Sequence, residues 1–452
     1  MTAVLSLINI ILLSVGAFIM IDKLVNNLSI SLKCLLSLAV IFSSLSILYY
    51  FSLAIHASFY LLLAIMSGIN IFHLYRYQSI GVCNAVIKAN APKAGAFFRS
   101  KLFFIACSAV LLLSIGFAKL STRWGGWDAW AIWNLHAKFL FYPDSWAHMF
   151  TNKIAFSHPD YPLMIPSLVA FFWRSLGSIT PFIPAIICYC ILLAVPLVIS
   201  IALYQQYRSV IAAILPLIIL IPDPKFLFIA CSQCADTPLA LFILLSFIFY
   251  RKVGTTNASL LYFVGFIAAS ATWIKNEGIL FYLSFTTTFI LFNIRKPRLL
   301  VRYFVGSLLP LVALASFKMG YAPANDLIRT NRFEDIKQQL LQVNRYKTII
   351  KALFSVVLSY YLIIPILICV ALAYKFYFFR SFSFIALSIV CIGYFFVYVT
   401  TPNDLEWHLG SSADRVIHHI YPAMIYLLLS KLIQLIPRKR RAVVLPQKIM
   451  EN

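Results

Sequence analysis

Long uninterrupted apolar runs constrain this chain more than any other feature of its sequence. Hydrophobic residues make up 62% of the 452 residues and charged residues only 11%, whereas about a quarter of a soluble chain is charged. The runs are about 18 to 25 residues long, the length of a helix that crosses a bilayer. They do not alternate with the period of two that membrane barrel strands require. The sequence therefore predicts an all-α polytopic membrane helical bundle.

Basic residues indicate the orientation of these segments. The net charge is +23, from 37 basic and 14 acidic residues, and most basic side chains fall in short connections between apolar runs. Cytoplasmic loops are rich in Lys and Arg, so we place the tail 437–441 and the connections 76–101, 251–252, 295–302 and 375–380 in the cytoplasm. The charge excess is explained by this orientation and by anionic headgroups better than by nucleic-acid binding.

One apolar segment should not cross the membrane. The predicted outer loops 121–160 and 223–235 are separated by three apolar segments, although an even number of crossings must join two loops on the same side. Pro162 and Pro166 disrupt the first turns of 161–177, which makes it the re-entrant or half-length helix. Irregular backbone at membrane depth is tolerated only where it lines a protein cavity, so a functional site is expected nearby.

The apolar segments predict about 13 transmembrane helices together with re-entrant and juxtamembrane helices. Residues 1–101 form N-terminal transmembrane helices and a basic cytoplasmic loop. Residues 102–300 form a module with the outer loop 121–160, and residues 301–452 hold further helices, the outer loop 321–347 and a basic tail. The predicted apolar segments are 3–21, 32–52, 55–75, 102–120, 161–177, 181–203, 209–222, 236–250, 258–274, 278–294, 303–320, 348–373, 382–400 and 415–436.

Acidic residues are scarce, and four of them stand at the outer edges of apolar segments. Asp128 lies in WGGWDAW, Asp160 in HPDYP, Asp236 in ADTPL and Glu277 in WIKNEG. Charged side chains near membrane depth are costly, which favours a functional interpretation. Capping of a following helix is the alternative for the three aspartates.

The outer loop 121–160 is rich in tryptophan, which favours the headgroup region. If Asp128 opens an α-helix, Asp128, Ile132, Leu135 and Phe139 share one stripe. That pattern predicts a helix that lies flat on the bilayer surface with its carboxylate at the N-terminal end.

Basic side chains are predicted on the same outer side. Lys275 stands beside Glu277, and Arg415 shares one face of the last predicted span with His418 or His419. An external ion pair and interfacial snorkelling are the alternatives. A carboxylate can take a proton from an acceptor hydroxyl or amine, and cations can stabilise a departing phosphate. The pattern therefore favours displacement of a lipid-linked phosphate at the outer face.

The order and sidedness of these motifs resemble the polytopic GT-C glycosyltransferases, in particular the protein O-mannosyltransferase and lipid A aminoarabinose transferase group. Members carry an acidic residue in the first large external loop, then a Pro-rich motif, then an aspartate after a later span. GWD, HPDYP and ADTPL match this order, and WIKNEG looks like a segment of bacterial members. The resemblance covers roughly residues 100–300. Three predicted spans precede 102–120 here, whereas the family's catalytic loop usually follows the first span.

The resemblance implies a GT-C-like membrane glycosyltransferase with Asp128 as catalytic base. The implied donor is a sugar on polyprenyl phosphate, because nucleotide sugars are not generally available outside the cytoplasm. The acceptor would be a glycan, lipid or protein of the cell envelope. The expected location is the bacterial cytoplasmic (inner) membrane, with the active site on the periplasmic face. The expected substrate-binding residues are Asp160, Asp236, Lys275, Glu277, Arg415, His158 and Tyr161.

The sequence leaves metal dependence open. His136, His148 and His158 share the outer loop with Asp128 and Asp160, so a divalent metal is an alternative to metal-free chemistry. No other cofactor is expected, and no nucleic-acid partner.

Two other functions compete with the glycosyltransferase. A polysaccharide polymerase or ligase that uses a diphosphate-linked glycan favours an outer loop rich in Arg and His late in the chain. The loop 321–347, with Arg329, Arg332 and Arg345, fits in part, whereas the Asp128 motif does not. A transporter or lipid flippase requires ionisable residues at mid-bilayer and related halves, but the charges here stand at the edges of spans and no inverted repeat is evident.

Overall fold

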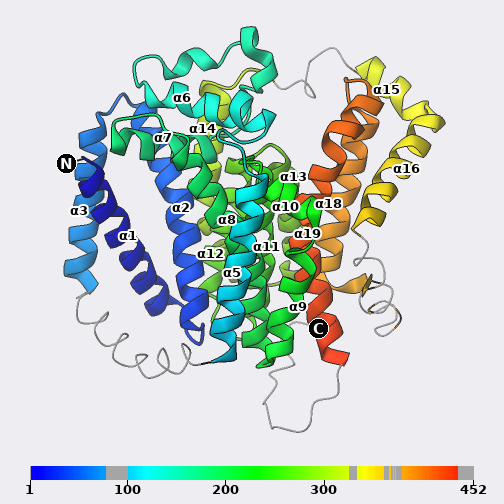
Figure 1. Ribbon diagram of the computed structural model, residues 1–452, viewed down its shortest axis with the longest axis horizontal. Helices are drawn as coiled ribbons and strands as arrows, with labels where there is room; N and C mark the ends of the chain where they lie inside the picture. The colour runs from blue at the N-terminus through cyan, green and yellow to red at the C-terminus, as the bar shows by residue number, and fades with distance from the viewer. Residues whose placement is uncertain are drawn as a thin grey trace.

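The computed structural model describes residues 2–77, 100–324, 333–360, 366–367, 370, 372 and 379–435. The regular structure of these residues is helical throughout, with no strand among them, which confirms the predicted fold class at that level (Figure 1). The helices are α1 Thr2–Leu24, α2 Ile30–Ala54, α3 Phe59–Tyr77, α5 Lys101–Leu120, η1 Ala129–Trp133, α6 Asn134–Phe141, η2 Trp146–Met149, η3 Asn152–Ser157, α7 Met164–Leu176, α8 Phe182–Tyr207, α9 Val210–Leu220, α10 Pro224–Ala230, α11 Asp236–Val253, α12 Leu260–Ile274, α13 Glu277–Asn293, α14 Pro297–Gly320, α15 Phe333–Leu341, α16 Val343–Ser359, α18 Phe382–Val399 and α19 Leu405–Leu435.

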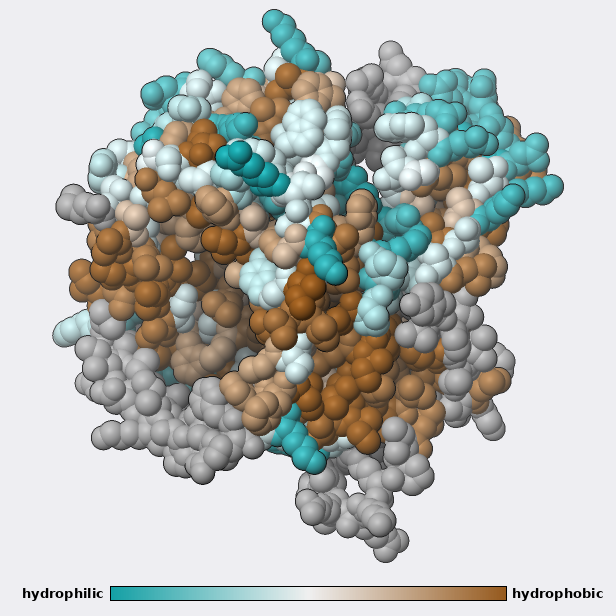
Figure 2. All heavy atoms as spheres, viewed as in Figure 1, coloured by the Kyte–Doolittle hydropathy of each residue, from teal (hydrophilic) through white to brown (hydrophobic). Residues whose placement is uncertain are grey.

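Several helices have the length and composition of membrane spans. Within the described residues seven helices pass this test, or eight if the bent pair α9 and α10 forms one span. Helices α3, α7 and α12 include shorter apolar stretches. In Figure 2 hydrophobic surface covers the middle of the visible face, and hydrophilic side chains gather toward the end that carries α6 and α15. The chain is therefore an integral membrane protein of the helical type.

The two predicted outer loops lie at one end of the bundle. Figure 1 places α6, from the loop 121–160, and α15, from the loop 321–347, at this shared end, and α19 ends at the opposite one. The sequence predicted that both loops face the same side of the membrane, and in the structure α6 and α15 lie at the same end of the bundle.

The segment predicted to stop short of a full crossing forms α7. This helix has 13 residues, so it is about 20 Å long, less than the roughly 30 Å of a bilayer core. Pro166 stands in its first turn, where a backbone N–H is not needed for helical hydrogen bonds. Near its other end Arg174 Nη1 donates to the carbonyl of Phe141, the last residue of α6, at 3.5 Å. The C-terminal end of α7 therefore contacts α6, which belongs to the predicted outer loop 121–160.

The segment predicted as the span 209–222 is a broken helix. Helices α9 and α10 meet at an angle of 78° around the sequence IPDP. Pro222 and Pro224 lack the N–H groups that would continue α9. Asp223 then begins α10, because its Oδ1 accepts hydrogen bonds from the N–H groups of Lys225 and Phe226 at 3.0 and 3.1 Å.

The last helix begins earlier than predicted. The hydropathy pattern placed its start at residue 415, whereas α19 begins at Leu405. Asp404 Oδ1 accepts a hydrogen bond from the Trp407 N–H at 2.8 Å, which caps the first turn. Arg415 therefore lies well inside the helix, and its direction is set by the helix on both sides. The predicted span 348–373 is represented by α16, which starts at Val343, and part of it lies outside the described residues.

The N-terminal helices pack directly on the central ones. Tyr49 on α2 donates to the carbonyl of Leu140 on α6 at 2.8 Å. The indole N–H of Trp273 on α12 donates to Ser46 on α2 at 2.9 Å. These buried hydrogen bonds hold α2 against α6 and α12.

Helices α12 and α14 approach closely because each carries a glycine at the contact. A Cβ at Gly265 would lie 2.0 Å from the carbonyl oxygen of Tyr303, and a Cβ at Gly306 would lie 1.9 Å from that of Tyr262. Small residues allow helix backbones to approach in this way within a membrane. Ser307 adds a hydrogen bond to the Gly265 carbonyl at 3.1 Å.

We expect Gly306→Ala to destabilise the protein by about 1–3 kcal/mol, because the new methyl group forces α12 and α14 apart. The matched control is Gly320→Ala at the end of the same helix, where no atom lies within 4 Å of the added Cβ. Thermal unfolding of the purified protein in detergent measures both. Equal melting temperatures for the two variants would contradict the close approach of α12 and α14.

Candidate functional site

A buried carboxylate with three basic partners forms the centre of the site. Asp236, the first residue of α11, has only 1% of its surface exposed. Its Oδ1 lies 2.9 Å from Lys275 Nζ and 2.7 Å from His419 Nε2. Its Oδ2 accepts from Nη2 and Nε of Arg415 at 3.0 and 3.1 Å. Both oxygens are thus satisfied, as burial of a charge requires.

Capping does not explain Asp236. The N-cap of α11 is Ala235, and no side-chain hydrogen bond caps this helix. The carboxylate points instead to residues of α19 and of the connection between α12 and α13. The capping alternative from the sequence is therefore wrong at this position.

The geometry indicates which nitrogen of His419 carries a proton. A carboxylate oxygen accepts hydrogen bonds only, so Nε2, 2.7 Å from Asp236, carries the hydrogen. Nδ1 lies 3.1 Å from the hydroxyl of Tyr394 and accepts from it in the neutral ring. Tyr394 on α18 thereby orients the imidazole toward Asp236.

Arg415 joins Asp236 to the outer loop. Its Nη1 lies 2.5 Å from Asp128 Oδ2, while Nη2 and Nε hold Asp236. A guanidinium presents its donors in a planar fork, so one arginine can hold two carboxylates at once. The prediction that Arg415 and a histidine three or four residues later share a face is confirmed, because His419 contacts the same carboxylate.

The loop that carries Asp128 is docked on the segment before α11. Gly126 N–H donates to the Ser232 carbonyl at 2.9 Å, and Gln233 Nε2 donates to the Thr122 carbonyl at 2.9 Å. Gly125 has φ +80°, and a Cβ there would lie 2.4 Å from the Cβ of Ala129. Only glycine fits this left-handed turn without strain, and the turn directs Asp128 toward Arg415.

A π-helical turn follows Asp128 in place of the predicted regular α-helix. Residues Ala129–Trp133 form the π-helix η1, and α6 continues from it. The wider turn buries Ile132 and Trp133 and leaves Trp127 and Trp130 more than half exposed. The predicted α-helical stripe through Asp128, Ile132, Leu135 and Phe139 is therefore wrong, because a π-turn shifts the side chains after it. Such turns are frequent at functional sites.

The connection between α12 and α13 contributes a buried ion pair. Lys275 Nζ lies 2.7 Å from Glu277 Oε1 in addition to its contact with Asp236. Burial opposes the charge of Lys275, but the two adjacent carboxylates hold its pKa above the usual value. The predicted ion pair is present, and it is part of a larger network. Glu277 Oε2 is buried and has no hydrogen-bond partner among the described residues.

Asp160 belongs to a second polar cluster beside the first. Its Oδ2 accepts from Asn276 Nδ2 at 2.7 Å. Lys318, near the end of α14, donates to the Asp160 carbonyl at 2.6 Å and to Asn276 Oδ1 at 2.9 Å. Asp160 does not cap α7, whose N-cap is Leu163. Lys318 was not among the predicted site residues, although a lysine near the outer end of a predicted span was a signal.

Tyr161 connects the two clusters. Its ring stacks on His158, with centroids 4.8 Å apart, and on Trp133, with centroids 5.5 Å apart. Lys275 Nζ lies 6.0 Å from the centroid of the same ring. Burial, followed by the nearby charge of Glu277, raises the pKa of Tyr161 well above its usual value, so the phenol stays protonated. His158 adopts a left-handed conformation with φ +47°.

The histidines predicted as metal candidates do not gather into a metal site. Among the residues that the structure describes, no three His, Cys, Asp or Glu side chains are grouped to hold a metal ion. His136 is fully buried, and burial together with nearby His158 lowers its pKa to about 4, so it is neutral at pH 7. His148 is exposed.

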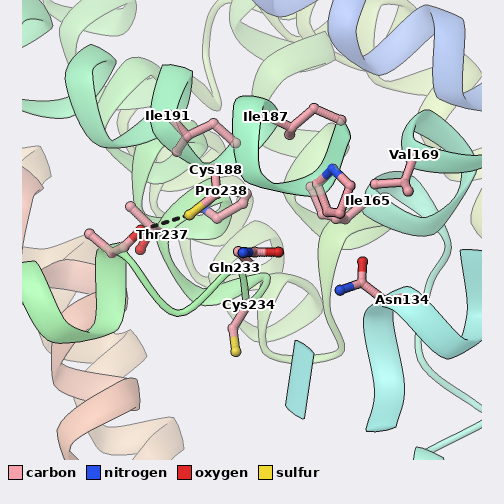
Figure 3. A pocket seen from close by; sticks show the side chains of 12 residues that line it. Asn134, Ile165, Val169, Ile187, Cys188, Ile191, Gln233, Cys234, Thr237 and Pro238 are labelled. Atoms are coloured by element: carbon pink, nitrogen blue, oxygen red, sulfur yellow. Dashed lines mark hydrogen bonds between the residues drawn. The ribbon is translucent and has the colours of Figure 1, made fainter. Parts of the chain in front are cut away.

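A small pocket lies between α7, α8 and the segment that leads into α11. In Figure 3 the Gln233 amide lies in the middle of the view and Asn134 at its edge, with apolar side chains around them. The volume is about 10 Å³, roughly that of a single water site, so it is not a sugar pocket. Burial raises the pKa of Cys234 to about 12 and that of Cys231 to about 11, so neither of these two thiols is a nucleophile at pH 7.

Comparison with protein-family models, curated proteins and solved structures finds no match for this chain. The site therefore stands on its own geometry. Of the predicted residues, the structure joins Asp128, Asp236, Lys275, Glu277 and Arg415 in one network. Asn276, between Lys275 and Glu277, binds Asp160, and Tyr161 stacks on His158.

We expect Asp236→Asn to lower the free energy of unfolding by about 3–5 kcal/mol, because it leaves the buried charges of Lys275 and Arg415 poorly compensated. Asp144→Asn, on the exposed part of the outer loop, is the matched control and should melt like the wild type. Thermal unfolding in detergent is the measurement. An unchanged melting temperature for Asp236→Asn would refute the ion network.

Proposed function

We propose that this chain is a membrane glycosyltransferase that moves a sugar from a polyprenyl-phosphate-linked donor to an extracytoplasmic acceptor. The observation that supports this is the meeting of three carboxylates and two cations from four separate segments in one network. These residues are Asp128, Asp236, Glu277, Lys275 and Arg415. Transfer from a phosphate needs both a base and cationic stabilisation of the leaving group.

Asp128 is the proposed general base because it is the accessible carboxylate bound to Arg415. Its side chain is 21% exposed, whereas that of Asp236 is 1% exposed and has both oxygens occupied. The second oxygen of Asp128 has no hydrogen-bond partner among the described residues. It would take the proton from the acceptor hydroxyl or amine while the acceptor atom bonds to the anomeric carbon.

Arg415 and Lys275 are the proposed contacts of the donor phosphate. The bond between the anomeric carbon and the phosphate oxygen breaks, and polyprenyl phosphate leaves with the bonding electrons. An arginine fork matches phosphate oxygens as well as it matches carboxylates. Asp160, Glu277, His158 and Tyr161 line the approach in this proposal.

The polyprenyl chain requires an apolar surface that reaches the outer loop. Helix α5 leads directly into that loop, and most of its surface is uncovered, with Phe104 65% and Leu111 62% exposed. An open groove on this helix supports its assignment to the lipid. The groove is lined by Phe103, Ala106, Cys107, Val110, Leu111 and Ser114.

The proposal includes three finer features that the sequence predicts. They are a GT-C-like fold with about 13 spans, a bacterial inner membrane, and a site on the periplasmic face.

The competing polymerase or ligase function was suggested by three arginines in the loop 321–347, and one of them is engaged in contacts within the protein. Arg345 donates to the carbonyls of Val399, Tyr398 and Thr401, and thus joins α16 to the end of α18. Arg329 and Arg332 lie outside the described residues.

We expect Asp128→Asn to reduce sugar transfer by about 10²- to 10⁴-fold, because the amide cannot accept the acceptor's proton. The measurement is transfer of radiolabel from a panel of polyprenyl-phosphate sugars to cell-envelope fractions.

The control is Asp144→Asn, which should transfer at the wild-type rate, and both variants should remain folded. Equal transfer by Asp128→Asn would remove the base assignment. Passage of an intact solute across the membrane without any bond formed would favour a transporter instead.

A further inference from the structure

The short helix α10 contacts one face of α19 at three points. These contacts lie beside the ion network and involve residues that the proposed reaction does not use. The pairs are Lys225 Nζ with Asp414 Oδ1 at 2.6 Å, Phe226 with His418 at 5.6 Å between ring centroids, and the Tyr421 hydroxyl with Asp223 Oδ2 at 2.7 Å.

The contacts with α10 come from residues of α19 that are next in sequence to the residues of α19 that bind Asp236. Asp414, His418 and Tyr421 are four and three residues apart, so they form one stripe along α19. Arg415 and His419 follow the first two by one residue, or about 100° around the helix, and form the neighbouring stripe. One stripe faces α10 and the other faces Asp236. A rotation of α19 that broke the first set of contacts would also move the second.

The three contacts differ in strength. Lys225 and Asp414 are 34% and 48% exposed, so their ion pair contributes little. Asp223 is 8% exposed, and a hydrogen bond to a buried carboxylate is among the stronger ones. Its other oxygen caps α10, so the Tyr421 hydroxyl is tied to the start of that helix.

His418 extends the same stripe to α11. Its ring is fully buried, and Nε2 lies 3.0 Å from the hydroxyl of Thr237, the residue after Asp236. The stripe Asp414, His418 and Tyr421 is therefore held against α10 by three contacts. They are the buried hydrogen bond of Tyr421, the ring stack of His418 and the weak ion pair of Asp414.

We propose that α10 sets the rotation of α19, and that Tyr421 is a positioning residue for Arg415 and His419. Acting through the helix, Tyr421 holds Arg415 against Asp236 and Asp128, and His419 against Asp236. The catalytic meaning of this inference rests on the proposed function, whereas the positioning itself can be measured without any substrate.

The first test compares Tyr421→Phe with Tyr426→Phe in the full-length protein in detergent. Tyr426 is also buried on α19, but its hydroxyl has no hydrogen-bond partner among the described residues. The probe is phenylglyoxal, which modifies arginine, and peptide mass spectrometry measures the rate at Arg415. We expect modification about tenfold faster in Tyr421→Phe and an unchanged rate in the control. Wild-type reactivity of Arg415 in a folded Tyr421→Phe protein would overturn the proposal.

A charge exchange provides a second test that does not disturb the buried core. Lys225→Asp and Asp414→Lys should each accelerate modification of Arg415 slightly, and the double variant should restore the wild-type rate. Faster modification in the double variant than in either single variant would contradict a role for this pair.

A transfer assay then separates positioning from function. Tyr421→Phe should raise KM for the donor more than it lowers kcat, and should have little further effect in an Arg415→Lys background, because both changes act on the same contact. Additive effects would overturn the role of Tyr421 in positioning Arg415. If the labelling rates follow the expectation but the wild-type protein transfers no sugar, the positioning stands and the proposed function fails.

Discussion

The charge of Asp236 must be compensated within the protein, and the arrangement of the outer end follows from that requirement. An isolated buried carboxylate would be prohibitively costly. Its partners are Lys275, from the connection between α12 and α13, and Arg415 and His419, both from α19. These segments must therefore converge at the start of α11. Arg415 also reaches Asp128, so the outer loop is held by the same compensation.

Irregular backbone makes this convergence sterically feasible. Gly278 lies so close to α12 that a Cβ would be 1.9 Å from the Ala271 carbonyl oxygen, which lets Lys275 turn inward. Gly125 allows the tight turn before Asp128, and η1 widens the helix just after it. Regular helices form the body of the protein, and the special positions are confined to the ends of segments where the polar residues meet.

The sequence predicted that four acids would gather at one side of the membrane; three of them share one network, Asp160 lies in a second cluster, and the way they are held was not predicted. Hydropathy locates the edge of each span, and that placed Asp128, Asp236 and Glu277 near one plane. It does not reveal the rotation of a helix or which helices are neighbours, so Lys318 and the contacts of α10 with α19 were missed. The polar first turns of α19 were read as a loop, because hydropathy does not register the Asp404 cap. The π-turn at η1 was missed because its residues are ordinary helix formers and tryptophans.

The two central aspartates differ in burial and in the number of their contacts. Asp236 has both oxygens bonded to basic groups, so a proton on it would cost at least one of those contacts. Asp128 has one oxygen on Arg415 and is partly accessible, so the network holds it from one side only. In the proposed reaction, residues of one chemical type thus serve as a fixed anchor, Asp236, and as the base, Asp128. Arg415, which contacts both, bridges the accessible carboxylate of Asp128 to the buried one of Asp236.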